Sequence, residues 1–299
     1  MKKLLTTAIT FAMLTSISAV AKEGGDQYPN GAENWLAGAV PPPGEYFLNY
    51  AGNWNGTLKD SSGNTVKAPN GKKIEMNATF DALRYVRVTN QTIFGANYGF
   101  AGILPIVNLG IDAAGNKGSR TGIGDITITP IILAWHTPEL HYVFGLDLNL
   151  PTGSYDTSNH PGKNIGANYY SLEPVFGLTY LNQSGWEVST KFMYNIKSKN
   201  KETNYQSGDE FHVDYLVGKH FGPFAVGVSG YYLKQVTDDK LNGIKVGTDG
   251  NRGQVFSYGP SIKYENSKHQ HFILQWQHET AVENRFGGDK VWFKFITAL

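Results

Sequence analysis

The stretch His141-Tyr-Val-Phe-Gly-Leu-Asp-Leu-Asn-Leu150 decides the fold, because its side chains alternate strictly between two kinds. Each even-numbered position holds a large apolar or aromatic side chain. The odd-numbered positions hold His141, Val143, Gly145, Asp147 and Asn149. A period of two is typical of a β-strand with one apolar face. Its ten residues match the roughly 9–11 that a tilted strand needs to cross a bilayer.

The same alternation recurs along the chain and predicts twelve strands, many of them about ten residues long, whereas strands of ordinary globular proteins average about 5–6 residues. In the second and fourth of them the two faces do not separate cleanly. The predicted strands span residues 45–53, 78–88, 94–104, 124–135, 141–150, 171–181, 186–196, 211–221, 224–235, 255–264, 271–277 and 291–297.

The predicted connections alternate between short and long. The short ones are 89–93, 136–140, 182–185, 222–223 and 265–270, and the long ones are 54–77, 105–123, 151–170, 197–210, 236–254 and 278–290. An outer-membrane barrel has short periplasmic turns and longer extracellular loops, and a sheet can cross a bilayer only when it closes on itself. We therefore predict an all-β, transmembrane, antiparallel up-and-down barrel of about twelve strands, with both termini on the short-turn side. The alternative is a soluble β-sandwich with one polar face.

The composition excludes several other classes of protein. The chain has 299 residues and no cysteine, which rules out disulfide scaffolds, thiolate metal sites and cysteine nucleophiles. A net charge of +1 provides no basic surface for nucleic acid. The mean hydropathy of −0.32 is too polar for a bundle of membrane helices. We expect no cofactor.

The first residues read as an export signal. A basic start, an apolar run and the sequence Ala19-Val20-Ala21 predict a cleaved signal peptide over residues 1–21 and hence a location in the bacterial outer membrane. Residues 22–44 are predicted to be a periplasmic segment or partial plug, with Trp35 and Leu36 inserted into the periplasmic mouth; a flexible tail is the alternative. Residues 45–299 are assigned to the barrel. Its expected partners are outer-membrane lipid and the outer-membrane assembly machinery.

Charged side chains on the polar strand faces are predicted to line the lumen, because an Arg or Lys facing lipid at mid-depth costs about 2–4 kcal/mol. Lys191 is the natural partner for Glu173 and Glu187. These side chains could contact a solute, or they could fill the lumen as an ion-pair network. The candidate lumen-lining residues are Asp147, Glu173, Glu187, Lys191, His212, Asp214, Gln275 and Gln277.

The sequence gives little support for catalysis or metal binding. The sequence has no Gly-x-Ser-x-Gly elbow, no HExxH and no phosphate-binding glycine loop. The stretch Lys268-His269-Gln270-His271 places two imidazoles on one strand face, but a metal site needs three or four ligands, so a solvated turn is favoured. We expect neither catalytic residues nor a bound metal, and we predict that the protein is not an enzyme.

Five short motifs together resemble the family of outer-membrane barrels named for the meta-pathway of phenol degradation. They are Pro41-Pro42-Pro43-Gly44-Glu45-Tyr46-Phe47, Gly122-Ile123-Gly124-Asp125, Leu150-Pro151-Thr152-Gly153-Ser154-Tyr155, Ser207-Gly208-Asp209-Glu210-Phe211-His212 and Glu283-Asn284-Arg285. The resemblance covers roughly Tyr28 to Leu299. It implies a channel for passive uptake of small hydrophobic or aromatic compounds and supplies no established binding residues. The alternatives are a structural or adhesive barrel that transports nothing, and a barrel enzyme acting on lipids.

Overall fold

The computed structural model describes residues 26–158 and 163–299, and the predicted signal peptide lies outside these ranges. Among the described residues, no helix has the length and apolar character needed to span a membrane. The strands of the main sheet are β1 (Gly44–Leu58), β2 (Ile74–Ile93), β3 (Ala96–Ala113), β4 (Asn116–Ile123), β5 (Thr127–His136), β6 (Leu140–Asn149), β7 (Ser171–Leu181), β8 (Trp186–Lys197), β10 (Glu210–Phe221), β11 (Phe224–Gln235), β14 (Gln254–Glu265), β15 (His271–Glu283) and β16 (Phe286–Ala298). A small separate sheet contains β9 (Tyr205–Gln206), β12 (Lys240–Leu241) and β13 (Ile244–Lys245).

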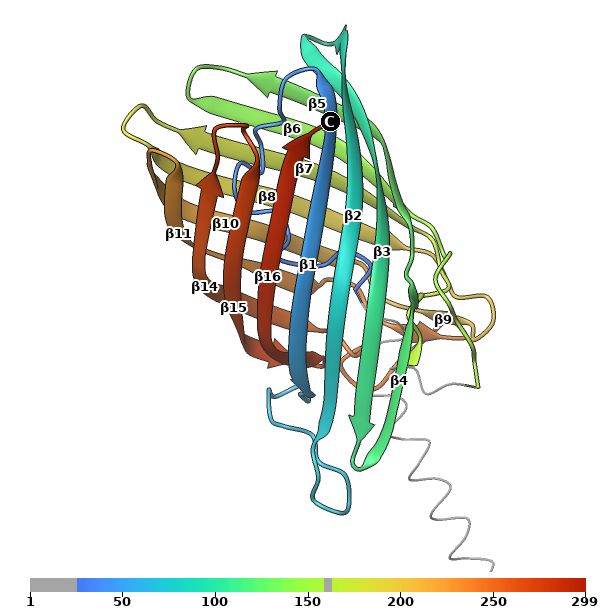
Figure 1. The fold of residues 1–299 in the computed structure, drawn as a ribbon. Coiled ribbons are helices and arrows are strands. Elements are labelled where there is room, and N and C mark those ends of the chain that lie inside the picture. Colours follow the sequence, from blue (N-terminus) through green and yellow to red (C-terminus); the bar gives the residue numbers. More distant parts are fainter. Residues whose placement is uncertain (1–25, 159–162) are drawn as a thin grey trace, which may run out of the picture.

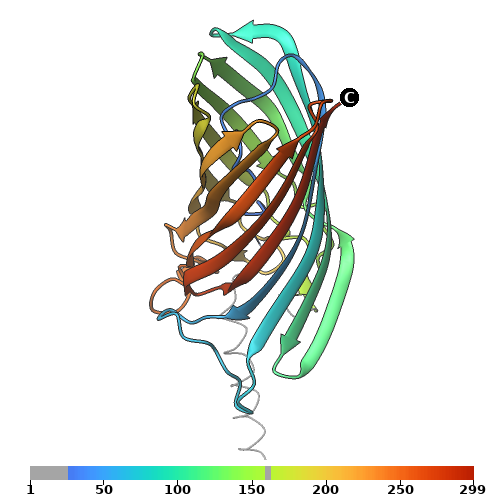
Figure 2. The ribbon, with the colours of Figure 1, turned by 60° about the vertical axis from the view of Figure 1, so that its left-hand side comes forward.

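The main sheet closes into a barrel (Figures 1 and 2). Strand β1 pairs antiparallel with both β2 and β16, from Tyr46 opposite Ala298 to Leu58 opposite Phe286. Strands β4 and β5 share one position in the ring, because β3 pairs with β5 as far as Ile103 and with β4 from Ile106 onward. The described chain therefore forms a twelve-position antiparallel barrel, which confirms the predicted fold and excludes the sandwich.

The apolar faces of the strands point outward. Phe144 and Phe176 are partners across β6 and β7 and are 37% and 42% exposed, whereas the next polar pair along the same strands, Asp147 and Glu173, is buried. Buried carboxylates beside exposed phenylalanines are the inverse of a soluble protein and fit a barrel whose outer surface meets acyl chains.

The unclear register in the fourth predicted strand, residues 124–135, has a structural cause. The β5–β6 pairing shifts between Ile128 and Ile131, on either side of Pro130, which has no N–H to donate to the ladder. A bulge of this kind moves later side chains to the other face, so the alternation in the sequence is broken there.

We call the two ends of the barrel the short-turn end, where β10 joins β11 through Gly222-Pro223, and the long-loop end, where the β1–β2 and β6–β7 connections lie. The predicted alternation of connection lengths is wrong at the β15–β16 connection, which is the tight turn Asn284-Arg285. It is also wrong for residues 105–123, which are largely strand.

At the long-loop end β2 carries outward polar side chains such as Glu75 and Asn77, so the strands continue past the apolar belt into water.

Candidate functional site in the barrel lumen

Residues 26–40, which we call the lumen segment, run through the inside of the barrel from the long-loop end to the short-turn end (Figure 1). At the long-loop end Gln27 donates to Asp125 (2.9 Å). At the short-turn end the Gly38 N–H donates to the hydroxyl of Thr179 (2.9 Å). The segment therefore extends farther than the short-turn mouth in which the sequence placed it, and its first described residue, Asp26, lies at the end opposite to Leu299. The reason is that β1 begins only at Gly44, after the segment has crossed the lumen. The N-terminus, predicted on the short-turn side, lies outside the described residues.

Asp214 on β10 anchors the middle of the lumen segment. Its carboxylate accepts hydrogen bonds from the Tyr28 hydroxyl (2.7 Å), the Gly31 N–H (2.8 Å) and the Glu33 N–H (3.1 Å). Gly31 has φ = +84°, a conformation that glycine adopts without strain and that directs its N–H toward the same carboxylate as its neighbours. Because Asp214 is fully buried, these three donors take the place of water around its charge.

The ion pairs of the lumen differ from those that the sequence suggested. Lys191 pairs with Glu33 of the lumen segment (2.6 Å), and Arg84 on β2 contacts the same carboxylate. The predicted pairing of Lys191 with Glu173 and Glu187 is therefore wrong. Those two carboxylates have histidine partners instead: Glu173 lies 3.2 Å from His212 and Glu187 lies 2.7 Å from His220.

Trp35 fits a recess in the barrel wall. Its indole N–H donates to Ser261 (2.8 Å), and its ring meets His220 edge-on at a centroid distance of 5.6 Å. A methyl group at Gly218 would lie 2.5 Å from the ring, and one at Gly227 would lie 3.3 Å from it. Two glycines facing each other across β10 and β11 thus leave the space that the indole fills.

Leu36, the other predicted plug residue, is half-buried and contributes its backbone. Its N–H donates to Glu187 (2.6 Å), and its φ of 56° turns the chain at this point. Three carbonyls in the middle of the lumen segment, those of residues 30–32, are bound by inward side chains of β15 and β16. Gln275 and Gln277 donate to the Gly31 carbonyl (3.2 and 3.4 Å), and Lys290 donates to the Asn30 carbonyl (2.9 Å).

All eight predicted lumen-lining side chains are buried on the inner side of the barrel. Five of them form hydrogen bonds with the lumen segment: Glu187, Lys191, Asp214, Gln275 and Gln277. The His212 ring lies 5.4 Å from the ring of Tyr28 in the segment. Glu173 and His212 bind each other, and Asp147 accepts from Thr129. Sequence reasoning missed Glu33, Arg84, Lys290 and Lys294. The alternation of β16 could have indicated the two lysines, since both share the inward face with Trp292.

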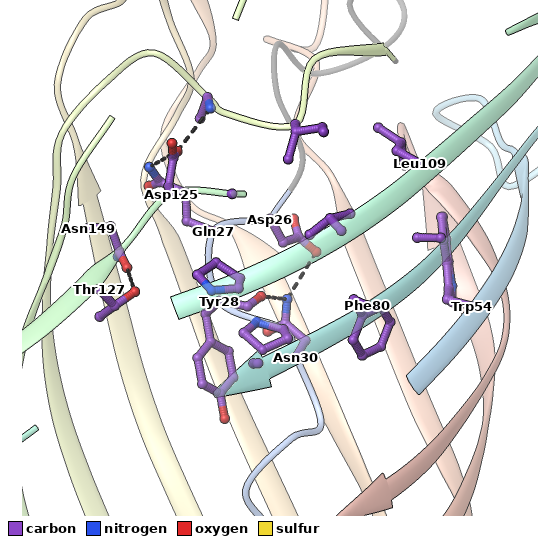
Figure 3. A pocket seen from close by; sticks show the side chains of 18 of the residues that line it. Asp26, Gln27, Tyr28, Asn30, Trp54, Phe80, Leu109, Asp125, Thr127 and Asn149 are labelled. Carbon is purple, nitrogen blue, oxygen red and sulfur yellow. Dashed lines mark hydrogen bonds between the residues drawn. The ribbon is translucent and has the colours of Figure 1, made fainter. Parts of the chain in front are cut away.

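A cavity of about 280 Å³ lies at the long-loop end, between the lumen segment and the inner faces of β2 and β3. One wall is apolar and includes Phe80, Ile103 and Val107. Figure 3 shows Phe80, Trp54 and Leu109 on this side, with Asp26, Tyr28 and Asn30 of the lumen segment opposite. The cavity therefore combines an apolar wall with a polar one. Among the described residues, no group of three or more His, Asp or Glu side chains could hold a metal ion.

A family model described as the MetA-pathway of phenol degradation matches residues 55–295. The chain belongs to this family. No curated protein sequence matches it. The structure is similar to the COG4313 outer membrane channel from Pseudomonas putida F1, with a TM-score of 0.76 and 14% identity over 88% of this chain and 98% of the other. It is less similar to the translocator domain of the autotransporter NalP from Neisseria meningitidis. That TM-score is 0.48, with 8% identity over 88% of this chain and 91% of the other. At such identities the similarity concerns the fold.

Proposed function

We propose that this protein is an outer-membrane channel for passive uptake of small hydrophobic compounds, aromatic compounds among them. The closed barrel with its apolar outer belt, the membership of the phenol-degradation family and the fold shared with an outer membrane channel all support this proposal. It also implies contact with outer-membrane lipid and insertion by the outer-membrane assembly machinery.

The cavity at the long-loop end is the observation that carries the proposal. A pore for ions or sugars is lined by polar groups, whereas one wall of this cavity consists of Phe80, Ile103, Val107 and their neighbours on β2 and β3. Apolar lining with a few placed polar groups is the usual character of a site for a small organic molecule. A hydrophobic solute arriving at the long-loop end would gain free energy by leaving water for this wall.

Passage beyond the cavity requires the lumen segment to move. In the middle of the barrel, Tyr28 and Ala32 pack in one cluster with Tyr50 and Ala82 on one wall and Met193 on the other. The segment thus bridges opposite walls at this depth. We propose that solute in the cavity advances when the segment shifts from its hydrogen-bonded position, and that the solute gradient drives the flow.

Uptake by intact cells tests the proposal. A strain lacking the gene should take up a labelled, dilute aromatic compound more slowly than its parent, and the native gene should restore the rate. Uptake of a small hydrophilic sugar serves as the control and should not change. Equal uptake of every hydrophobic and aromatic compound tested, with and without the gene, would refute the proposal.

The filled middle of the lumen favours a second candidate, a structural or adhesive barrel that transports nothing. Deleting residues 22–39 separates the two. In a channel closed by its lumen segment, the deletion should raise the conductance in planar bilayers above that of the native protein. Unchanged conductance in a correctly folded, heat-modifiable variant would count against a plug and favour the second candidate.

A further inference from the structure

We infer that the outer face of the barrel carries a binding groove for uncharged sugar chains, where strands β16, β1, β2, β3 and β4 continue beyond the apolar belt. The occupant that we assign to it is the sugar portion of neighbouring glycolipids in the outer leaflet of the membrane. The groove is separate from the lumen and its cavity, so this inference goes beyond the proposed function and does not depend on transport.

The groove lies at the long-loop end and has a volume of about 750 Å³, within the roughly 300–1,000 Å³ usual for ligand sites. Strands β2, β3 and β4 reach farther at this end than β14 and β15 (Figure 1). The last outward apolar side chains before the groove are Val291 on β16, Ile106 on β3 and Ile123 on β4. The groove therefore begins just above the belt, in the layer of the lipid headgroups. In the outer leaflet of a bacterial outer membrane these headgroups are sugar chains.

The groove is built from polar side chains that share rows across the five strands. One row contains Asp289, Asn55, Asn77, Gly110 and Ser119. The row beyond it contains Thr57, Glu75, Asp112 and Lys117. A methyl group at Gly110 would lie 2.4 Å from Oδ1 of Asn77, so the missing side chain lets this amide lie low over β3. Because neighbouring strands are about 4.8 Å apart, the rows are roughly 19 Å long, which suits a chain of linked rings.

Three side chains in the middle of the groove have no partner in the protein. Within the described part of the chain, Glu75, Asn77 and Ser119 form no side-chain hydrogen bond or ion pair, and all three are exposed. The row next to the belt is different, because Asn53 donates to Thr79 across the strands (3.0 Å). The donors and acceptors at the centre of the groove are thus available to a ligand.

The residue types of this surface are unusual for strands. Asparagine and aspartate are depleted in strands, where β-branched residues are favoured. Outward positions beyond the belt nevertheless hold four asparagines and two aspartates, which are Asn53, Asn55, Asn77, Asn108, Asp112 and Asp289. A departure from local preference is expected where a binding site needs the side chain.

The chemistry of the groove fits an uncharged sugar. Amides, hydroxyls and carboxylates together can donate to and accept from sugar hydroxyls, which are themselves donors and acceptors. Of the described residues that line the groove, three are carboxylates, Glu75, Asp112 and Asp289, and one is a cation, Lys117. This excess of negative charge disfavours phosphates and other anions. The outward side chains of the groove include no aromatic residue of the kind that anchors a protein partner.

Binding of a sugar chain to the purified full-length protein tests the inference. The probe is the uncharged polysaccharide that mild acid releases from the glycolipid of the same bacterium, free of its lipid part, and calorimetry measures its affinity. We expect saturable binding that excess inorganic phosphate does not displace. Asn77→Ala should weaken binding about fivefold, as expected for the loss of one hydrogen bond. Asn90→Ala removes an exposed amide from the short-turn end of the same strand and, as the matched control, should bind like the native protein.

Glu75→Lys provides a second variant that leaves the amides in place. It should weaken binding of the sugar chain and allow inorganic phosphate to compete, because the excess of carboxylates is gone. No binding of the chain by the native protein, or native affinity in Asn77→Ala, would overturn the inference. Displacement of the chain from the native groove by inorganic phosphate would assign an anionic ligand and overturn it as well. Equal affinity for dextran would overturn the assignment to the membrane's own glycolipid.

Discussion

The substitution Asp214→Asn should release the lumen segment, because Asp214 receives three of its hydrogen bonds. Gly31 donates to Oδ1, and Tyr28 and Glu33 donate to Oδ2. An asparagine has nearly the same shape but only one acceptor oxygen, and its amide nitrogen is a donor. At least one donor of the segment would then face another donor in a buried place.

The size of the effect follows from these contacts. One buried donor left unpaired costs about 1–3 kcal/mol, and each of the two remaining hydrogen bonds loses about 1 kcal/mol when its acceptor is no longer charged. The lower desolvation cost of a neutral amide offsets part of this loss. A net change of about 3 kcal/mol remains, which corresponds to roughly a 100-fold increase in the population with the segment undocked.

Thiol labelling measures this population, since the chain contains no cysteine of its own. In an Ala32→Cys background the single thiol sits where the side chain is 2% exposed, so it should react only when the segment undocks. Asp214→Asn should accelerate labelling about 100-fold. Asp81→Asn, which alters a carboxylate on the outer face of β2, should leave the rate unchanged. A rate for Asp214→Asn within threefold of the parent, in a heat-modifiable barrel, would refute the reasoning.

Three further outcomes are expected. Gly218→Ala places a methyl group 2.5 Å from the indole of the lumen segment and should also accelerate labelling, by overpacking worth about 1–3 kcal/mol, whereas Gly102→Ala, with nothing within 4 Å of the added carbon, should not. An epitope inserted directly before Asp26 should bind antibody on intact cells, and binding only after permeabilisation would contradict the path of the segment. The backbone N–H of Asn64, with a second one from the same turn, lowers the pKa of Asp60. Hydrogen exchange should therefore show that the backbone N–H groups of this turn are protected at pH 5. The protection should be lost as the pH falls from 3.8, the ordinary pKa of an aspartate, through the lowered pKa of Asp60.

The side chains that face outward and inward could be predicted from the sequence wherever the alternation is unbroken. On β6 and β7 the predicted faces agree with the structure residue by residue, because a strand exposes alternate side chains regardless of its partners. The two faces could not be separated around Pro130, where a bulge breaks the period. The strand ends were predicted wrongly in β15 and β16, because these strands continue in water beyond the apolar belt.

The sequence by itself determined that this chain forms a closed barrel and that its charged side chains point inward, because both follow from the period of a strand and the solvent around it. The partners of those charges were decided by the tertiary structure. Lys191 and Glu33 are 158 residues apart, and they meet because the lumen segment passes through the barrel before its first strand begins. Strand periodicity constrains nothing about a segment without regular structure, so neither its path nor the cavity beside it could be derived from the sequence.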